Sequence, residues 1–325
     1  MSQPLADLNS GPLRWRLMPD KDLDHFSSQP EADEGLCAAL NAALPAGTGA
    51  ICFIAPYQGE RLSPTRIAYA QINIRDELAM EEAIQALVAA KTKKVILLLN
   101  TPGGGVSSSF KIARALRESF KEITVLVPHI AASGGTLLAM TGDKIVMGMM
   151  SHLTPIDVQV PRGESTVSVN SMMRVFERLN KIFETTAEED APYPIKAMAD
   201  KLDPVEFQEW VDVSRLMIEH ADDVLELNPA LKDKRQTIIN RLTRNLPSHS
   251  YAIVLPEAKD IFGPTVVLSP EEWGNLPLWK AASAWLRHYV LEEASRHIIH
   301  YHLPPKETKT NHAPEPTQIP AAIAR

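Results

Sequence analysis

Four short runs rich in apolar residues mark the first half of the chain. They cover residues 50–55, 95–99, 123–127 and 144–147. Runs of this length, bounded by charged residues and glycine turns, are typical of strands buried on both faces of a parallel sheet. We therefore predict strands at these positions.

Between these runs, apolar residues recur at helical spacing. This spacing covers residues 75–90 and 107–120, and shorter helical stretches are predicted over 34–44 and 136–141. Strand, glycine turn, helix and strand in this order is the pattern of βαβ units with right-handed crossovers. The sequence thus predicts an α/β fold.

The second half of the chain first becomes helical and then returns to the α/β pattern. Strand-like runs reappear at residues 251–255 and 265–268, and a final amphipathic helix is predicted over 278–300. We expect an N-terminal extension at 1–45, a main domain at 46–268 whose residues 167–245 are mostly helical, a C-terminal helix within 269–303, and a proline-rich disordered tail at 304–325.

Composition narrows the class of protein. Hydrophobic residues make up 45% of the 325 residues, and the net charge is −7 with no basic stripe, which argues against nucleic-acid binding. The two cysteines are too few for a disulfide framework and fit a reducing compartment. No apolar run approaches the roughly 20 residues that span a bilayer, and the N-terminus lacks a signal-peptide pattern. We expect a cytoplasmic protein that binds neither nucleic acid nor membrane.

Two glycine-rich turns follow neighbouring predicted strands. The first reads Asn-Thr-Pro-Gly-Gly-Gly over residues 100–105, and the second reads Pro-His-Ile-Ala-Ala-Ser-Gly-Gly over residues 128–135. On adjacent parallel strands, such turns can place backbone N–H groups of one loop beside a serine oxygen of the other. That is the geometry of a nucleophile facing an oxyanion hole.

Ser133 is the candidate nucleophile. Ala131 and Gly135 flank it at two positions on either side, which relaxes the Gly-x-Ser-x-Gly nucleophile elbow to Ala-x-Ser-x-Gly. At a helix N-terminus the helix dipole would stabilise developing negative charge. The structural alternative is that Ser133 only caps the following helix, which is the commoner role of an isolated Ser-Gly-Gly.

The loop at Gly103–Gly105 fits an oxyanion loop better than a phosphate site. A Walker loop requires a Gly-Lys-Ser/Thr ending, and a dinucleotide loop requires spaced glycines; the contiguous glycines followed by Val106 meet neither requirement. The structural alternative is a tight turn that uses glycine for its positive φ.

A serine hydroxyl needs a base to remove its proton. Three histidines follow strands or precede them: His129, His152 and His249. The residues alone do not rank these three, because partners in such sites come from distant loops. Asp157 is the candidate to orient the base, and Lys144 is the candidate for a Ser–Lys dyad, although it opens a predicted strand.

No metal or cofactor is predicted. His297, His300 and His302 close the last predicted helix without an acidic or cysteine partner at a metal-binding spacing. We interpret them as the ordinary end of a helix.

Four segments in order carry a resemblance to a known family. They are Leu-Leu-Asn-Thr-Pro-Gly-Gly, Val-Pro-His-Ile-Ala-Ala-Ser-Gly-Gly-Thr-Leu, Gly-Asp-Lys-Ile-Val-Met-Gly and Leu-Thr-Pro-Ile-Asp-Val-Gln, which begin at residues 98, 127, 142 and 153. Together they resemble the serine dehydrogenase proteinase family, distant relatives of the Clp protease subunit and of signal peptide peptidase A. The late segment around His249 is similar too, so the resemblance spans residues 50–268.

The resemblance implies a Clp/crotonase-type fold of repeated ββα units and a serine peptidase site. By position, Ser133 would be the nucleophile, with Asp157 and His249 completing a triad and His152 as the rival base. The N–H groups of Gly134 and of Gly103 or Gly104 would form the oxyanion hole.

The chain also departs from the family pattern. Asn100 stands where the family usually has histidine, Thr154 and Val158 replace a glycine and a proline, and Ser250 replaces an aspartate. Many members carry an N-terminal membrane helix that is not found here, which favours a soluble assembly.

We therefore expect a serine endopeptidase that cleaves peptide bonds through an acyl-enzyme on Ser133, without a cofactor. It would act as a homo-oligomer, with the helical segment or the C-terminal helix available to a partner protein. The alternatives are a non-catalytic Clp-like scaffold or regulatory subunit, and an acyl-CoA-processing enzyme of the crotonase fold.

Overall fold

The computed structural model describes residues 14–15, 30–55, 71–162, 165–201, 203–243, 246, 248–291 and 298–304. Its centre is a seven-stranded sheet in the order β1-β12-β2-β3-β4-β6-β11. The strands from β2 to β11 run parallel, whereas β12 is antiparallel to β2 and β1 is antiparallel to β12. The strands are β1 (Arg14–Trp15), β2 (Thr48–Ile54), β3 (Lys94–Asn100), β4 (Glu122–Val127), β6 (Lys144–Met147), β11 (Val267–Leu268) and β12 (Ile298–His302).

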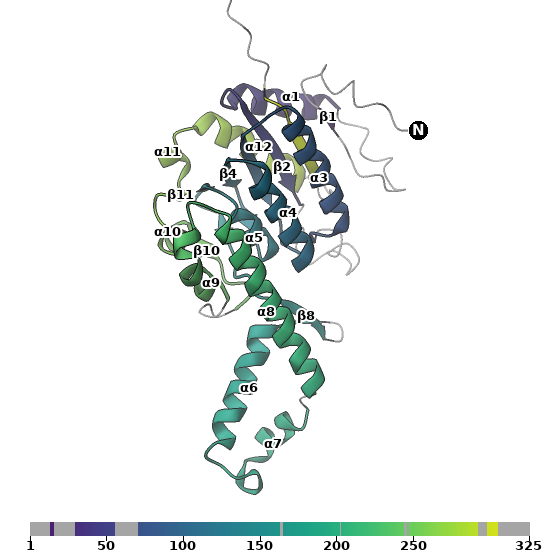
Figure 1. Ribbon diagram of the computed structural model, residues 1–325, viewed down its shortest axis with the longest axis vertical. Coiled ribbons are helices and arrows are strands. Elements are labelled where there is room, and N and C mark those ends of the chain that lie inside the picture. The colour runs from purple at the N-terminus through teal and green to yellow at the C-terminus, as the bar shows by residue number, and fades with distance from the viewer. Residues whose placement is uncertain are drawn as a thin grey trace, which may run out of the picture.

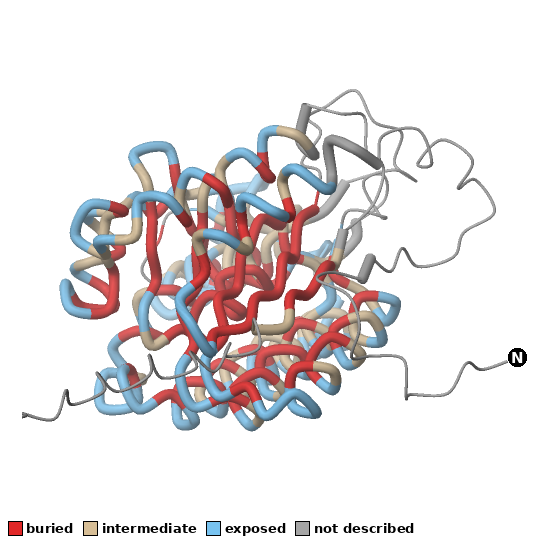
Figure 2. Tube along the Cα trace, turned by 90° about the horizontal axis from the view of Figure 1, so that it is seen from above, coloured by how far each residue is buried: buried red, intermediate tan, exposed pale blue. Residues whose placement is uncertain are grey.

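Helices cover both faces of this sheet (Figures 1 and 2). On one face lie α3 (Ile74–Ala89) and α4 (Val106–Ser119), and on the other lie α1 (Pro30–Ala43) and α12 (Leu276–Leu291). Successive residues of β3 point to opposite faces of the sheet. Leu97 packs in the cluster with α3 and α4, and Leu98 packs in the cluster with α1 and α12. Burial on both faces explains why these strands read as unbroken apolar runs.

A second, three-stranded sheet has the order β10-β7-β5. Its strands are β5 (Ile130–Ala131), β7 (His152–Leu153) and β10 (Ile253–Val254), with β5 parallel and β10 antiparallel to β7. An antiparallel hairpin of β8 (Gln159–Arg162) and β9 (Ser165–Ser168) follows β7. The predicted α/β fold is confirmed, and its sheets are mixed.

Three helices project from the α/β body as an arm (Figure 1). They are α6 (Val169–Phe183), α7 (Tyr193–Ala199) and α8 (Pro204–Glu226). The remaining helices are α5 (Gly134–Ala139), α9 (Arg235–Thr243), α10 (Leu255–Phe262) and α11 (Pro270–Trp273), with 3-10 turns at Glu188–Asp190 and Lys232–Lys234. Among the described residues, no helix is both long and apolar enough to cross a membrane.

The predicted helix over 278–300 is wrong at residues 298–300, and residues 292–297 lie outside the described residues. Helix α12 ends at Leu291, and residues 298–302 form β12, which completes the main sheet against β2. His300 and His302 are therefore buried strand residues rather than the end of a helix, and His300 stacks on Trp285 of α12. His297, which the sequence placed in the same helix, and the predicted tail from residue 305 onward lie outside the described residues.

Two predicted strands in the second half are shorter in the structure. The strand predicted over 251–255 is confined to β10, because α10 begins at Leu255, and the strand over 265–268 is confined to β11. The division of the chain at residues 45, 268 and 303 stays a prediction, although α1 and α12 pack in one hydrophobic cluster with β2 and β3.

Candidate active site

Ser133 lies on a strained turn between β5 and α5. Its backbone has φ 49° and ψ −111°, and among the described residues only Lys91 is another non-glycine with positive φ. A conformation of this kind costs about 1–3 kcal/mol and persists where the surroundings enforce it. The Ser133 side chain makes no capping hydrogen bond to α5. The alternative that this serine serves as a helix cap therefore has no support in the geometry.

Close backbone packing enforces the turn. A Cβ on Gly135 would lie 2.6 Å from Thr101 Cγ2, and a Cβ on Gly103 would lie 2.4 Å from the Ala132 carbonyl oxygen. The Ser133 N–H donates to Thr154 Oγ1 at 2.9 Å. The small residues around Ser133 are thus required by contacts with the neighbouring loop.

The two glycine turns are joined by backbone hydrogen bonds. The Thr101 N–H donates to the Ile130 carbonyl at 2.9 Å, and the Ala132 N–H donates to the Thr101 carbonyl at 3.0 Å. The buried Asn100 amide adds a clamp, donating to the Ala55 carbonyl at 2.9 Å and accepting from the Ile130 N–H at 3.2 Å. The departure from the family's histidine at this position therefore gives a residue that ties the ends of β2 and β3 to the start of β5.

The N–H groups of the glycine loop have different partners. The Gly103 N–H donates to Thr101 Oγ1 at 3.1 Å, and the Gly105 N–H donates to the Ile72 carbonyl at 2.8 Å. Within the part of the chain that the structure describes, the Gly104 and Gly134 N–H groups donate no hydrogen bond. These two amides lie close together, because a Cβ on Gly134 would be 3.4 Å from Gly104 N.

Ser133, Asp157 and His249 lie at the same end of the small sheet. Because β5 and β7 are parallel, Ser133 and Asp157, which follow them, leave the sheet on the same side. Strand β10 is antiparallel to β7, so His249, which precedes β10, lies on that side as well. These three residues are candidates from the sequence, and the directions of the strands place them at the same end of the sheet.

Asp157 and His249 interact electrostatically. Burial raises the pKa of Asp157, while the Ser168 hydroxyl and the Asn170 N–H, which donate to its carboxylate, act in the opposite direction. Burial lowers the pKa of His249, and the negative charge of Asp157 and a hydrogen bond to the Asp157 backbone oppose that shift. His249 Nδ1 is buried without a hydrogen-bond partner in the described structure. One ring nitrogen is therefore free to accept a proton.

The rival bases lie elsewhere. His152 is in β7 opposite Ile130, at the other end of the small sheet, and its ring is 5.9 Å from that of His129. Burial and the neighbouring His129 lower the pKa of His152, and no carboxylate contributes to the shift. Lys144 is the first residue of β6. Because β6 and β3 run parallel, it lies at the opposite end of the strands from the glycine loop, which follows β3. Its ammonium donates to the Thr265 carbonyl at 2.6 Å. The structure does not bring Lys144 to Ser133.

Residue types and spacing alone assign no role in the site to Thr154 or Asn100. Both act by side-chain bonds to the backbone of a distant segment, and no local spacing signals such a contact. Among the described residues, no group of three or more histidine, cysteine, aspartate or glutamate side chains could hold a metal ion.

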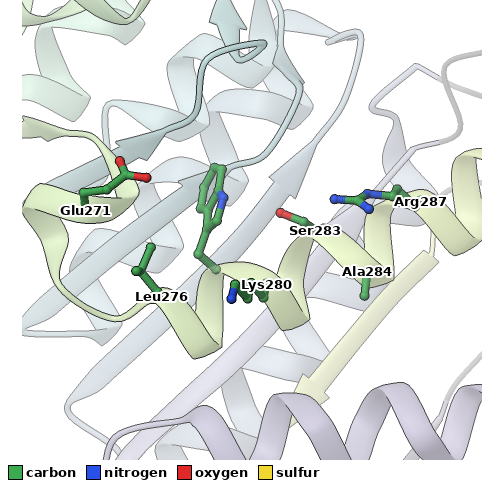
Figure 3. Close-up of a pocket in the computed structure, with 7 residues that line it drawn as sticks. Glu271, Leu276, Lys280, Ser283, Ala284 and Arg287 are labelled. Carbon is green, nitrogen blue, oxygen red and sulfur yellow. The ribbon is translucent and has the colours of Figure 1, made fainter.

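The pocket drawn in Figure 3 lies away from these residues. It has a volume of about 500 Å³ and is lined by Trp279, Lys280 and Arg287 of α12, together with Glu271 of α11. None of the predicted site residues lines it.

Comparison with known proteins relates part of the chain to one family. Residues 63–191 match the model of the ClpP-like SDH-type serine proteinases. The segment that is similar to this family makes up less than half of the chain. The match contains Ser133, Asp157 and both glycine turns, whereas His249 lies beyond it.

Three curated relatives are similar over parts of the chain. An uncharacterized protein of Methanocaldococcus jannaschii is 44% identical over 28% of this chain and 32% of its own length. A second from the same organism is 28% identical over 59% of this chain and 58% of its own length. The proteolytic subunit of an ATP-dependent Clp protease from Leuconostoc citreum is 25% identical over 40% of this chain and 70% of its own. The chain thus spans about a third of the length of the first relative and somewhat under three fifths of the length of the second.

Two solved structures are similar in fold. A variant of the 1510-N membrane-bound stomatin-specific protease, in complex with a substrate peptide, has 15% identity and a TM-score of 0.40, covering 62% of this chain and 74% of that one. A crystal structure of a putative enoyl-CoA hydratase from Streptomyces coelicolor A3(2) has 12% identity and a TM-score of 0.37, covering 76% and 71%.

Proposed function

We propose that the chain is a serine peptidase in which Ser133 is the nucleophile. The observation that carries the proposal is the strained backbone of Ser133 at the junction of β5 and α5. A sharp strand-to-helix turn of this kind exposes a serine oxygen above the end of a strand. A helix-capping serine has no need of this strain, and Ser133 makes no capping bond.

The amides of Gly104 and Gly134 would form the oxyanion hole. They come from the two joined turns, and each lacks an acceptor within the described structure. The Gly103 N–H is the weaker candidate because Thr101 Oγ1 already accepts from it. Two fixed N–H groups would stabilise the negative charge that develops on the carbonyl oxygen, without reorganisation during the reaction.

His249 would act as the general base and Asp157 as its partner. In this mechanism Ser133 Oγ attacks the peptide carbonyl carbon while His249 takes the hydroxyl proton, and Asp157 stabilises the imidazolium that forms. Collapse of the tetrahedral intermediate then breaks the C–N bond, and the proton passes from His249 to the leaving amine. A water molecule, activated by the same histidine, hydrolyses the acyl-enzyme.

The test is labelling by a fluorophosphonate probe, which reacts with activated serines. We expect the wild type to be labelled, Ser133→Ala to lose labelling completely, and His249→Ala to lose nearly all of it. His152→Ala is the matched control and should retain labelling. A wild type that resists the probe in every oligomeric fraction would contradict the proposal and favour the scaffold alternative. Labelling lost with His152→Ala but kept with His249→Ala would move the base to His152.

A further inference from the structure

The backbone N–H of Ser133 is held by one side chain, that of Thr154. The distance from Ser133 N to Thr154 Oγ1 is 2.9 Å, and within the described structure this N–H makes no other hydrogen bond. Helix α5 holds the other side of the residue, because the Ser133 carbonyl accepts from the Leu137 N–H in the first turn. The Thr154 hydroxyl therefore restrains the amide side of the strained residue.

The Thr154 hydroxyl is fixed in the direction that this bond requires. It donates its own hydrogen to the Pro155 carbonyl at 3.3 Å, so a lone pair of Oγ1 is left for the Ser133 N–H. The Thr154 backbone is fixed as well. Its N–H donates to Thr136 Oγ1 of α5 at 3.2 Å, and Thr136 Oγ1 lies 2.7 Å from the Thr154 carbonyl oxygen. Because both threonines are buried, these contacts rather than solvent set the position of the hydroxyl.

The segment that contains Thr154 also carries Asp157. Between them, the ring of Pro155 fixes one backbone torsion angle, and the Ile156 N–H donates to the Leu242 carbonyl of α9 at 3.3 Å. The segment is therefore held at several points along its length. Through Thr154, it joins the turn of the candidate nucleophile to the residue that would assist the base.

The chain departs from the family pattern at position 154. The pattern has glycine, which has no hydroxyl, whereas this chain has threonine. The branched side chain of threonine is stiff about χ1, so its hydroxyl keeps one direction once the backbone is fixed. The contact with the Ser133 N–H is therefore a property of this chain's own sequence.

We propose that Thr154 is a positioning residue, whose hydroxyl holds Ser133 in the backbone conformation that its attack on the substrate requires. The proposal rests on the proposed function of Ser133. Thr154 itself neither touches the substrate nor transfers a proton. Without its hydroxyl, the Ser133 backbone could relax from its strained conformation, and Ser133 Oγ would move relative to His249 and the oxyanion amides. A displacement of about 1 Å at a reacting group can lower the rate about 100-fold.

The experiment measures fluorophosphonate labelling rates, their pH profiles and melting temperatures in full-length variants. Thr154→Val keeps the shape of the side chain but loses the acceptor, and we expect it to react about 10- to 100-fold more slowly than wild type. Thr154→Ser keeps the hydroxyl but loses the methyl group, and it should retain most of the wild-type rate. In both variants the midpoint of the pH profile should stay at its wild-type value, because Asp157 and His249 are unchanged.

Thr141→Val is the matched control. Thr141 is buried just after α5, and its hydroxyl donates to the Leu138 carbonyl at 2.7 Å. This substitution also removes a buried hydroxyl without changing the shape of the side chain, so it should lower the melting temperature about as much as Thr154→Val does. Because Thr141 does not contact Ser133, labelling should proceed at the wild-type rate.

The outcomes separate this proposal from the proposed function. Labelling of Thr154→Val at the wild-type rate overturns the role of Thr154, while labelling of Ser133 in the same experiment upholds the peptidase. Equal slowing in Thr154→Val and Thr154→Ser, or in Thr154→Val and Thr141→Val, also overturns it, because packing or general stability would then set the rate. If Thr154→Val does not fold, Thr154→Ala takes its place with the same expected rate. A wild type that is not labelled contradicts both proposals.

Discussion

Ser133 illustrates how a backbone conformation links stability to chemistry. With φ 49° and ψ −111° it occupies a region that glycine adopts at little cost and other residues do not. We expect the free energy of unfolding, measured by chemical denaturation, to be about 1 kcal/mol higher for Ser133→Gly than for Ser133→Ala. Glycine relieves the strain of this backbone conformation. The greater backbone entropy of glycine in the unfolded chain offsets part of that stabilisation.

Lys111 in the middle of α4 provides the control for that comparison. It is exposed and has ordinary helical geometry, so Lys111→Gly should be less stable than Lys111→Ala by about 1 kcal/mol. If glycine lowers stability at both positions, the strain at Ser133 is not a feature of the protein in solution.

Asp157 and His249 predict a specific pH dependence. His249 must be neutral to act as a base, and burial holds its pKa below the ordinary value of about 6.5. The labelling rate should therefore rise with pH, with a midpoint below that value, and be level above neutral pH. The charge of Asp157 raises the pKa of His249, so Asp157→Asn should move the midpoint to lower pH and lower the plateau about 100- to 10,000-fold.

The same variant separates the two histidines. Burial and His129, not Asp157, lower the pKa of His152. If His152 were the base, Asp157→Asn would leave the midpoint where it is in the wild type. The measurement is the labelling rate between pH 4.5 and 8.5, with the intact fold checked by circular dichroism at each pH.

At the scale of the elements, Asn228 anchors the arm to the C-terminal end of α5. It follows α8, is fully buried, and donates to the carbonyls of Met140 and Gly142 at 2.8 and 2.9 Å, just after α5. Its own Oδ1 accepts from the Ala230 N–H. Asn228→Ala would leave several buried backbone groups unpaired, and we expect a loss of about 2–4 kcal/mol in the free energy of unfolding.

A surface asparagine calibrates that loss. Asn73 caps α3 in an exposed capping box, so Asn73→Ala should cost only about 1 kcal/mol by the same measurement. Equal losses at the two positions would contradict the anchoring role of Asn228.

The elements that the sequence predicted correctly are those with a local pattern. Strands β2, β3 and β4 are buried on both faces, so their apolar runs were sufficient, and α3 and α4 carried a clear helical spacing. Strand β12 was mistaken for helix because its partner β2 lies far away in the chain. The two-residue strands β5, β7 and β10 are too short to have a period at all.

The candidate site divides in the same way. The glycine turns and Ser133 could be found from residue types in sequence. Asp157 and His249 were among the candidates that the residues offered, and the resemblance favoured this pair. Asn100 and Thr154 could not be found, because each has its role through a contact with a segment that is distant in sequence.

At the scale of the whole molecule, the arm projects from the α/β body (Figure 1). Tyr193 of α7 is 80% exposed and Val205 of α8 is 67% exposed. Contiguous exposed apolar surface, rather than single residues, marks an interaction site, and we predict that Tyr193 and Val205 contribute to such a surface. Association of copies through the arm would bury them, and the arm is also joined to the candidate site, since Asn170 at the start of α6 donates to Asp157.

We therefore predict a homo-oligomer in solution. Light scattering should give a multiple of the 35.9 kDa chain mass, and Tyr193→Ser combined with Val205→Ser should lower that mass. Leu78→Ser, which removes a side chain of α3 that is 56% exposed on the body, is the control and should leave it unchanged. The Asn170 N–H at the start of α6 donates to Asp157, so dissociation of the oligomer in the arm variants should also slow labelling of Ser133. A wild type of single-chain mass would contradict the oligomer, and an unchanged mass in the arm variants would place the interface elsewhere.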